Sequence, residues 1–276
     1  MNISEAKESI LSLYQKALKI DEINCQEHPV RIIQAAKSII GLNRDCSHEK
    51  ILSFCEEYVN KYETIDGFYS MSLKLAPPMV SYKKLEEALL NSNPPDAFKS
   101  LESLMKVSDG MQILEFLIEY SLKHSNDSFL LIWSIYRMTL FCDRKFINEE
   151  LFLCLNSILK NSSKLDLKSL EIKTNQHKDL LLEFDLCSVL NSIYYAKLTR
   201  KDKIKESMLE FSFYDQSVKY SGEYLGRKFL WDYIDRCKML NPKTILNVDA
   251  YRNMMKLVED EGLNPLNLYQ FIDDYR

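Results

Sequence analysis

Glycine and proline are scarce in this sequence of 276 residues, which contains 6 glycines and 7 prolines. Average usage is roughly 7% for glycine and 5% for proline, so the chain has little material for tight turns, β-hairpins or phosphate-binding loops. No proline occurs between Pro95 and Pro242, and no glycine occurs between Gly110 and Gly222. The sequence therefore predicts a chain built mainly from helices.

Motifs with a specific chemistry are also missing. The sequence has no His-Glu-x-x-His, no Cys-x-x-Cys and no Gly-x-x-x-x-Gly-Lys, which excludes the common zinc-protease, zinc-ribbon and P-loop classes. A di-iron bundle needs a glutamate three places before a histidine, but here those places hold Cys25, Asp45, Ser121 and Thr174. We therefore expect no cofactor and favour a role without catalysis.

Two Cys/His pairs come closest to a metal site. Cys25 and His28 precede a predicted helix from Pro29 to Asn43, and Cys46 and His48 follow it. At 1.5 Å per residue this helix would hold the pairs roughly 22 Å apart, whereas the ligands of one zinc ion lie within about 2.3 Å of it. We expect His28 to stand before a helix-opening proline and His48 to lie in a first turn, with no metal bound.

The sequence offers no sign of export or of a membrane span. Its seven cysteines are an odd number, which is typical of reduced thiols and predicts a cytoplasmic or nuclear protein. Residues 1–8 lack the basic and apolar regions of a signal peptide. The most apolar stretch, Phe129 to Cys142, has 14 residues and includes Arg137, whereas a span needs about 18 residues. We expect no membrane partner.

Capping residues predict where helices begin. Ser81, Ser108 and Asp127 are expected N-caps. Three further starts pair a capping asparagine with a first-turn proline, at Asn93-Pro94, Asn241-Pro242 and Asn264-Pro265. The stretch from Phe129 to Cys142 is apolar on nearly all sides and predicts a central helix surrounded by others.

The expected fold class is all-α, as an irregular α-α superhelix or an array of helical hairpins packed as in TPR or HEAT proteins. The segment from Tyr14 to Asp21 resembles the second helix of a tetratricopeptide repeat, although it covers one half-repeat and does not recur about 34 residues later. We expect residues 1–276 to form a single helical domain. In segment 161–174 the apolar residues fit the alternating pattern of a strand about as well as helical spacing, and this segment is the candidate subdomain boundary.

One region differs in charge from the rest of the chain. Residues 197–243 contain 11 basic and 7 acidic residues, so this region carries a net charge of +4, whereas the remainder carries −8. Aromatic residues are frequent in the same region, and basic groups beside aromatic rings can bind phosphates and stack on bases. The candidate surface for an anionic partner consists of Lys201, Lys203, Lys205, Tyr214, Tyr224, Arg227 and Lys228.

Three functions remain open on these observations. The favoured hypothesis is a protein-protein interaction scaffold or complex subunit, because stacked helices leave grooves in which a partner segment can lie. The alternative is a nucleic-acid-associated subunit that uses residues 197–243. The third is an all-α enzyme with a small-molecule pocket between its helices.

Overall fold

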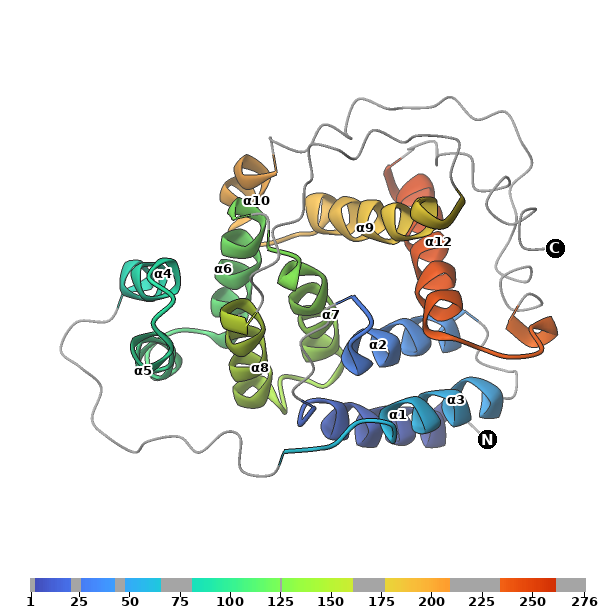
Figure 1. Cartoon of the computed structure of the whole chain (residues 1–276). Coiled ribbons are helices and arrows are strands. Elements are labelled where there is room, and N and C mark those ends of the chain that lie inside the picture. Colours follow the sequence, from blue (N-terminus) through green and yellow to red (C-terminus); the bar gives the residue numbers. More distant parts are fainter. Residues whose placement is uncertain are drawn as a thin grey trace.

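The computed structural model confirms the all-α fold class (Figure 1). It describes residues 3–20, 26–42, 48–65, 81–124, 126–160, 177–208 and 234–261. The candidate subdomain boundary at 161–174 and the helix start at Asn264-Pro265 lie outside these ranges. The helices are α1 (Ile3–Ala17), α2 (Pro29–Ile40), α3 (Glu49–Val59), α4 (Tyr82–Leu90), α5 (Pro94–Met105), α6 (Gly110–Lys123), α7 (Ser128–Phe141), α8 (Ile147–Lys160), α9 (His177–Tyr195), α10 (Lys201–Ser207) and α12 (Pro242–Glu261).

Several predicted helix starts are confirmed by their hydrogen bonds. The Ser81 hydroxyl accepts from the backbone N–H of Lys84 at 3.3 Å, as an N-cap of α4 should. Asn93 caps α5 and Asn241 caps α12 in the same way, and each stands directly before the proline that opens the helix. A first-turn proline loses nothing, because its missing N–H would have no partner within the helix.

Two predicted caps differ in part from the structure, at the starts of α6 and α7. Asp109, not Ser108, caps α6 and accepts from the N–H of Met111 at 3.0 Å. At α7 Asp127 occupies the N-cap position as predicted, but its side chain makes no capping bond, and the Asn126 side chain accepts from the N–H of Ser128 at 2.9 Å. In both places two capping residues stand side by side in sequence, and the backbone dihedrals decide which one reaches the free N–H groups.

Helix α7 lies at the centre of the array, as predicted from its apolar sequence. It packs against α2, α6, α8 and α9, and eleven of its 14 residues are buried. Trp133 is 5% exposed, and its ring stacks on that of Tyr136 with the centroids 5.3 Å apart. Burial on nearly every side explains why this helix lacks the polar face of its neighbours.

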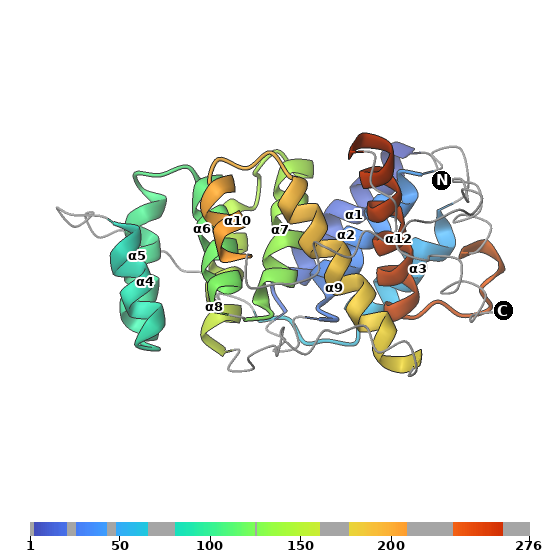
Figure 2. The same ribbon diagram turned by 90° about the horizontal axis from the view of Figure 1, so that it is seen from above.

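The order of the helices in space differs from their order in the sequence. Helices α4 and α5 form one end of the row, followed by α6 with α8, then α7, and then α2 with α1 and α3 at the other end (Figures 1 and 2). Helix α12 packs across α2 and α9, and α10 packs on α6. The array is therefore joined by contacts between distant segments as well as by successive hairpins.

Candidate functional site

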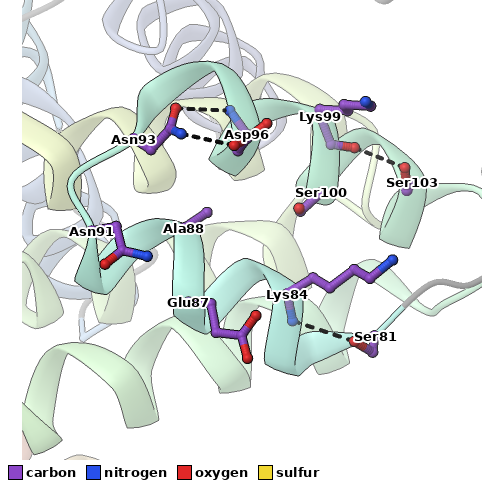
Figure 3. Close-up of a pocket in the computed structure, with 10 residues that line it drawn as sticks. All are labelled: Ser81, Lys84, Glu87, Ala88, Asn91, Asn93, Asp96, Lys99, Ser100 and Ser103. Carbon is purple, nitrogen blue, oxygen red and sulfur yellow. Dashed lines mark hydrogen bonds between the residues drawn. The ribbon is translucent and has the colours of Figure 1, made fainter.

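A polar groove of about 340 Å³ runs between α4 and α5, at one end of the row (Figure 3). The two helices lie antiparallel and are joined by a short turn, in which Ser92 adopts a positive φ of 48°. The groove is lined by Ser81, Lys84, Glu87, Ala88, Asn91, Asn93, Asp96, Lys99, Ser100 and Ser103.

Helical periodicity places these residues on facing stripes. The lining positions recur every three or four residues, at 84, 87, 88 and 91 on one side and at 96, 99, 100 and 103 on the other, so each set shares one helix face. Leu85 and Leu89 of α4 and Leu101 and Leu104 of α5 are buried on other faces. Burial of these leucines therefore turns the polar stripes toward each other.

The turn and the helix ends use some of the groove's polar groups. The Asn93 amide caps α5 and donates to the Asp96 carboxylate at 2.7 Å. The Ser103 hydroxyl donates to the backbone carbonyl of Lys99 at 2.8 Å. These residues are held in fixed positions and form the rigid part of the groove.

Other polar side chains in the groove have no hydrogen-bond partner within the part of the protein that the structure describes. Among the described residues, the side chains of Asn91, Lys99 and Ser100 make no hydrogen bond or ion pair. Asparagine and serine each supply both a donor and an acceptor, and lysine supplies three donors. This combination can bind both hydrogen-bond donors and hydrogen-bond acceptors of a ligand.

The charges of the groove balance. Its lining contains two lysines, Lys84 and Lys99, and two carboxylates, Glu87 and Asp96, and Glu87 also lies 3.8 Å from Lys83. A balanced set of charges gives no strong preference for a highly charged ligand of either sign. The groove therefore suits a polar ligand of low net charge.

The pair of helices is fixed to the rest of the array at both sides. The Tyr82 hydroxyl lies 2.8 Å from that of Ser108, and its ring packs on that of Phe116 in α6. On the other side, the rings of Phe98 in α5 and Phe152 in α8 stack with centroids 5.8 Å apart. These contacts fix both helices of the groove to the rest of the array.

The predicted surface for an anionic partner is only partly described. Lys201, Lys203 and Lys205 lie on α10, whereas Tyr214, Tyr224, Arg227 and Lys228 lie outside the described residues. Lys203 is exposed, and the Lys205 ammonium lies 3.8 Å above the ring of Tyr194. This surface stays a prediction.

Helix α10 is anchored on α6 by its N-terminal arginine. The Arg200 guanidinium pairs with the Glu119 carboxylate at 2.6 Å. The backbone N–H of Arg200 donates to Glu115 at 2.8 Å. The lysines of α10 are therefore held on a fixed helix beside the central row.

The two histidines of the candidate metal pairs are buried at helix starts. His28 caps α2, with Nδ1 accepting from the N–H of Val30 at 3.2 Å and Nε2 3.2 Å from the carbonyl of Ile20. His48 occupies the N-cap position of α3 rather than its first turn. Cys25 and Cys46 lie outside the described residues, and the described part of the chain contains no group of three or more residues that could hold a metal ion.

The comparisons with known proteins add no assignment: no family model, no curated protein and no solved structure matches this chain. Within the described ranges, no helix has the length and apolar character required to cross a bilayer.

The groove between α4 and α5 could not be predicted from the sequence. Polar residues at helical spacing are typical of any solvated helix face, so they do not mark a groove.

Proposed function

We propose that this protein is a non-catalytic scaffold that binds an extended segment of a protein partner in the groove between α4 and α5. The observation that carries this proposal is the set of unused groups on Asn91, Lys99 and Ser100 along one preformed groove. A polypeptide backbone needs donors and acceptors at regular intervals, and these side chains supply them.

The length of the groove agrees with a short peptide. Helix α4 has 9 residues and is therefore about 13 Å long, which is the span of roughly four extended residues. An interface of this size is small and belongs to weak or transient recognition. We therefore expect affinities in the micromolar range, strengthened where a partner contacts the array elsewhere.

The cysteines support a reducing compartment for this scaffold. Cys55, Cys142 and Cys154 are buried as free thiols, and burial raises the pKa of Cys55 and Cys142 to about 12. Such thiols resist oxidation because the thiolate is the reactive form. A cytoplasmic or nuclear setting is part of the proposal.

Selection from a displayed library of random peptides tests this function. The full chain serves as bait, and the Ser100→Trp variant, whose indole would occupy the groove, serves as the counter-bait. We expect enriched sequences that bind wild type and lose at least about tenfold in affinity for Ser100→Trp and for Lys99→Glu, since each removes a contact to the ligand.

The matched control is Lys203→Glu on α10, which makes the same charge change at an exposed lysine. Binding should survive this substitution. Peptides that bind wild type and Ser100→Trp equally well would contradict the groove as the binding site. Failure to enrich any sequence over several rounds would contradict peptide binding itself.

A further inference from the structure

Three cationic side chains surround one carboxylate where α2, α7 and α12 meet. The Asp249 carboxylate accepts from the Arg252 Nε at 3.0 Å and from the Arg137 Nη1 at 3.4 Å. Arg137 also donates to the Ser38 hydroxyl at 3.1 Å. Lys37, on the same helix as Ser38, lies within electrostatic range of Arg137, Asp249 and Arg252.

Lys37 lacks an acceptor for its ammonium group. Among the described residues it makes no hydrogen bond or ion pair, and its Nζ lies 5.2 Å from the centre of the Phe141 ring. The exposed Lys7 of α1 places a second ammonium 5.7 Å from the same ring. A contact with an aromatic face compensates a cation less than a carboxylate does.

The charges of this group do not balance. When Lys37 is protonated, Lys37, Arg137 and Arg252 carry three positive charges against the single negative charge of Asp249. The nearby carboxylate of Asp185 is already paired with Arg31 at 2.7 Å. An excess of positive charge at a partly buried site is costly unless an anion compensates it.

Arg137 and Arg252 have unused hydrogen-bond donors and are partly exposed to solvent. The side chains of Arg137 and Arg252 are 19% and 18% exposed. The Nε of Arg137 and the Nη1 of Arg252 donate no hydrogen bond within the described residues. Planar guanidinium groups with free N–H donors match the oxygens of a phosphoryl group.

We propose that Lys37, Arg137 and Arg252 form a binding site for a dianionic phosphoryl group. This phosphate site lies at the junction of α2, α7 and α12 and is distinct from the groove between α4 and α5. Its ligand is either a free phosphate or a phosphorylated side chain, since both present the same oxygens.

Binding of an anion to the phosphate site should be coupled to protonation of Lys37. Burial, together with the neighbouring charges of Arg137 and Arg252, lowers the pKa of Lys37 to about 7, while Asp249 acts in the opposite direction. The Cys142 thiol is also near, but burial keeps it neutral by raising its pKa to about 12. A bound dianion raises the pKa of Lys37, so binding at pH 8 takes up a proton and binding at pH 6 does not.

Isothermal titration calorimetry of the full chain with sulfate, inorganic phosphate and O-phosphoserine tests the proposal, at constant ionic strength set by chloride. Sulfate stays dianionic from pH 6 to pH 8, so its affinity should fall with rising pH only because Lys37 loses its proton. Titrations at pH 8 in two buffers of different ionisation enthalpy measure the proton uptake directly.

The test variant is Lys37→Gln and the matched control is Lys203→Gln on α10. Lys37→Gln should weaken phosphate and sulfate binding at pH 6 by about tenfold or more and abolish the proton uptake at pH 8. It should also raise Tm, because it removes a buried charge held beside two guanidinium groups. Loss of binding in a variant that is more stable cannot come from unfolding.

The outcomes separate the ligand sources. Tighter binding of O-phosphoserine than of phosphate would identify a phosphorylated side chain as the ligand, and the reverse order would identify a free phosphate. Absence of saturable binding by all three probes at millimolar concentration would overturn the proposal. Equal binding by wild type and Lys37→Gln would overturn it as well.

Discussion

The hydroxyl of Tyr14 in α1 donates a hydrogen bond of 2.7 Å to the carboxyl group of Glu150 in α8, across 136 positions of sequence. Both side chains are fully buried. On its other oxygen, Glu150 lies 2.7 Å from the Thr139 hydroxyl, which also lies 2.9 Å from the carbonyl of Ile135. Because threonine has one hydroxyl hydrogen, Thr139 donates to Glu150 or to Ile135, and a protonated Glu150 allows both contacts to be hydrogen bonds.

This geometry makes a prediction for Glu150→Gln. Burial raises the pKa of Glu150 from 4.5 to about 7, so the ionised carboxylate is disfavoured in the folded state. The protonated Glu150 therefore contributes fully to the stability of the folded state below pH 4.5, and this contribution is lost as pH rises through about 7. Glutamine keeps both hydrogen bonds without a charge.

Glu150→Gln should therefore match wild type in stability at pH 4 and exceed it by roughly 1 to 3 kcal/mol at pH 8. Urea unfolding at the two pH values measures this difference. The matched control is Glu57→Gln on α3, which is exposed and should show no such pH dependence. A stability difference that is the same at both pH values would contradict a protonated Glu150.

The buried pair of Arg31 and Asp185 joins α2 to α9 at 2.7 Å, and the Arg31 guanidinium also donates to the carbonyl of Gln26. Asp185→Asn should cost about 3 to 5 kcal/mol, because it leaves the Arg31 charge buried without its partner. The double variant Arg31→Met/Asp185→Leu should lose less than Asp185→Asn alone. Denaturant midpoints of the single and double variants form the test, and additive losses would show that the two charges do not interact.

Trp133→Ala should cost roughly 3 to 5 kcal/mol, because it removes a large buried side chain from the central helix α7. Its indole N–H makes no hydrogen bond within the described part of the chain, so Trp133→Phe should lose much less. Urea denaturation compares the two variants. Equal losses for alanine and phenylalanine would show that the indole N–H, and not the volume, stabilises the helix.

The nucleic-acid hypothesis makes a separate prediction for residues 197–243. Binding of single-stranded oligonucleotides should weaken with salt, with a slope of about −0.7 for each phosphate neutralised. Fluorescence anisotropy at two salt concentrations measures it for wild type and for a variant in which Lys201, Lys203, Lys205, Arg227 and Lys228 are reversed in charge. No binding at low salt, or binding unchanged by the reversal, would remove this hypothesis.

Local sequence signals predicted the helices better than their arrangement. The apolar stretch at 129–142 predicted central α7, and Asn93 and Asn241 before prolines marked two helix starts. These signals act within a few residues, so they can be recognised along the chain. Adjacent candidates such as Ser108 and Asp109 were not separable, because the choice depends on backbone dihedrals.

The sites depend on contacts that no local pattern contains. Arg137 is visible in the sequence as a charge within an apolar stretch, but its partner Asp249 lies 112 positions away. Lys37 looks like any lysine on a helix until Arg137 and Arg252 are placed beside it. The groove between α4 and α5 likewise arises only when two polar faces meet across a turn.

Hydrogen exchange of the full chain with and without a selected peptide tests the central claim most directly. If the peptide lies between α4 and α5, amide protection should increase in residues 82–105, while residues 201–207 of α10 remain unchanged. The Ser100→Trp variant should show no change on addition of the same peptide. Increased protection at α10 without any at α4 and α5 would contradict the groove as the binding site of this scaffold.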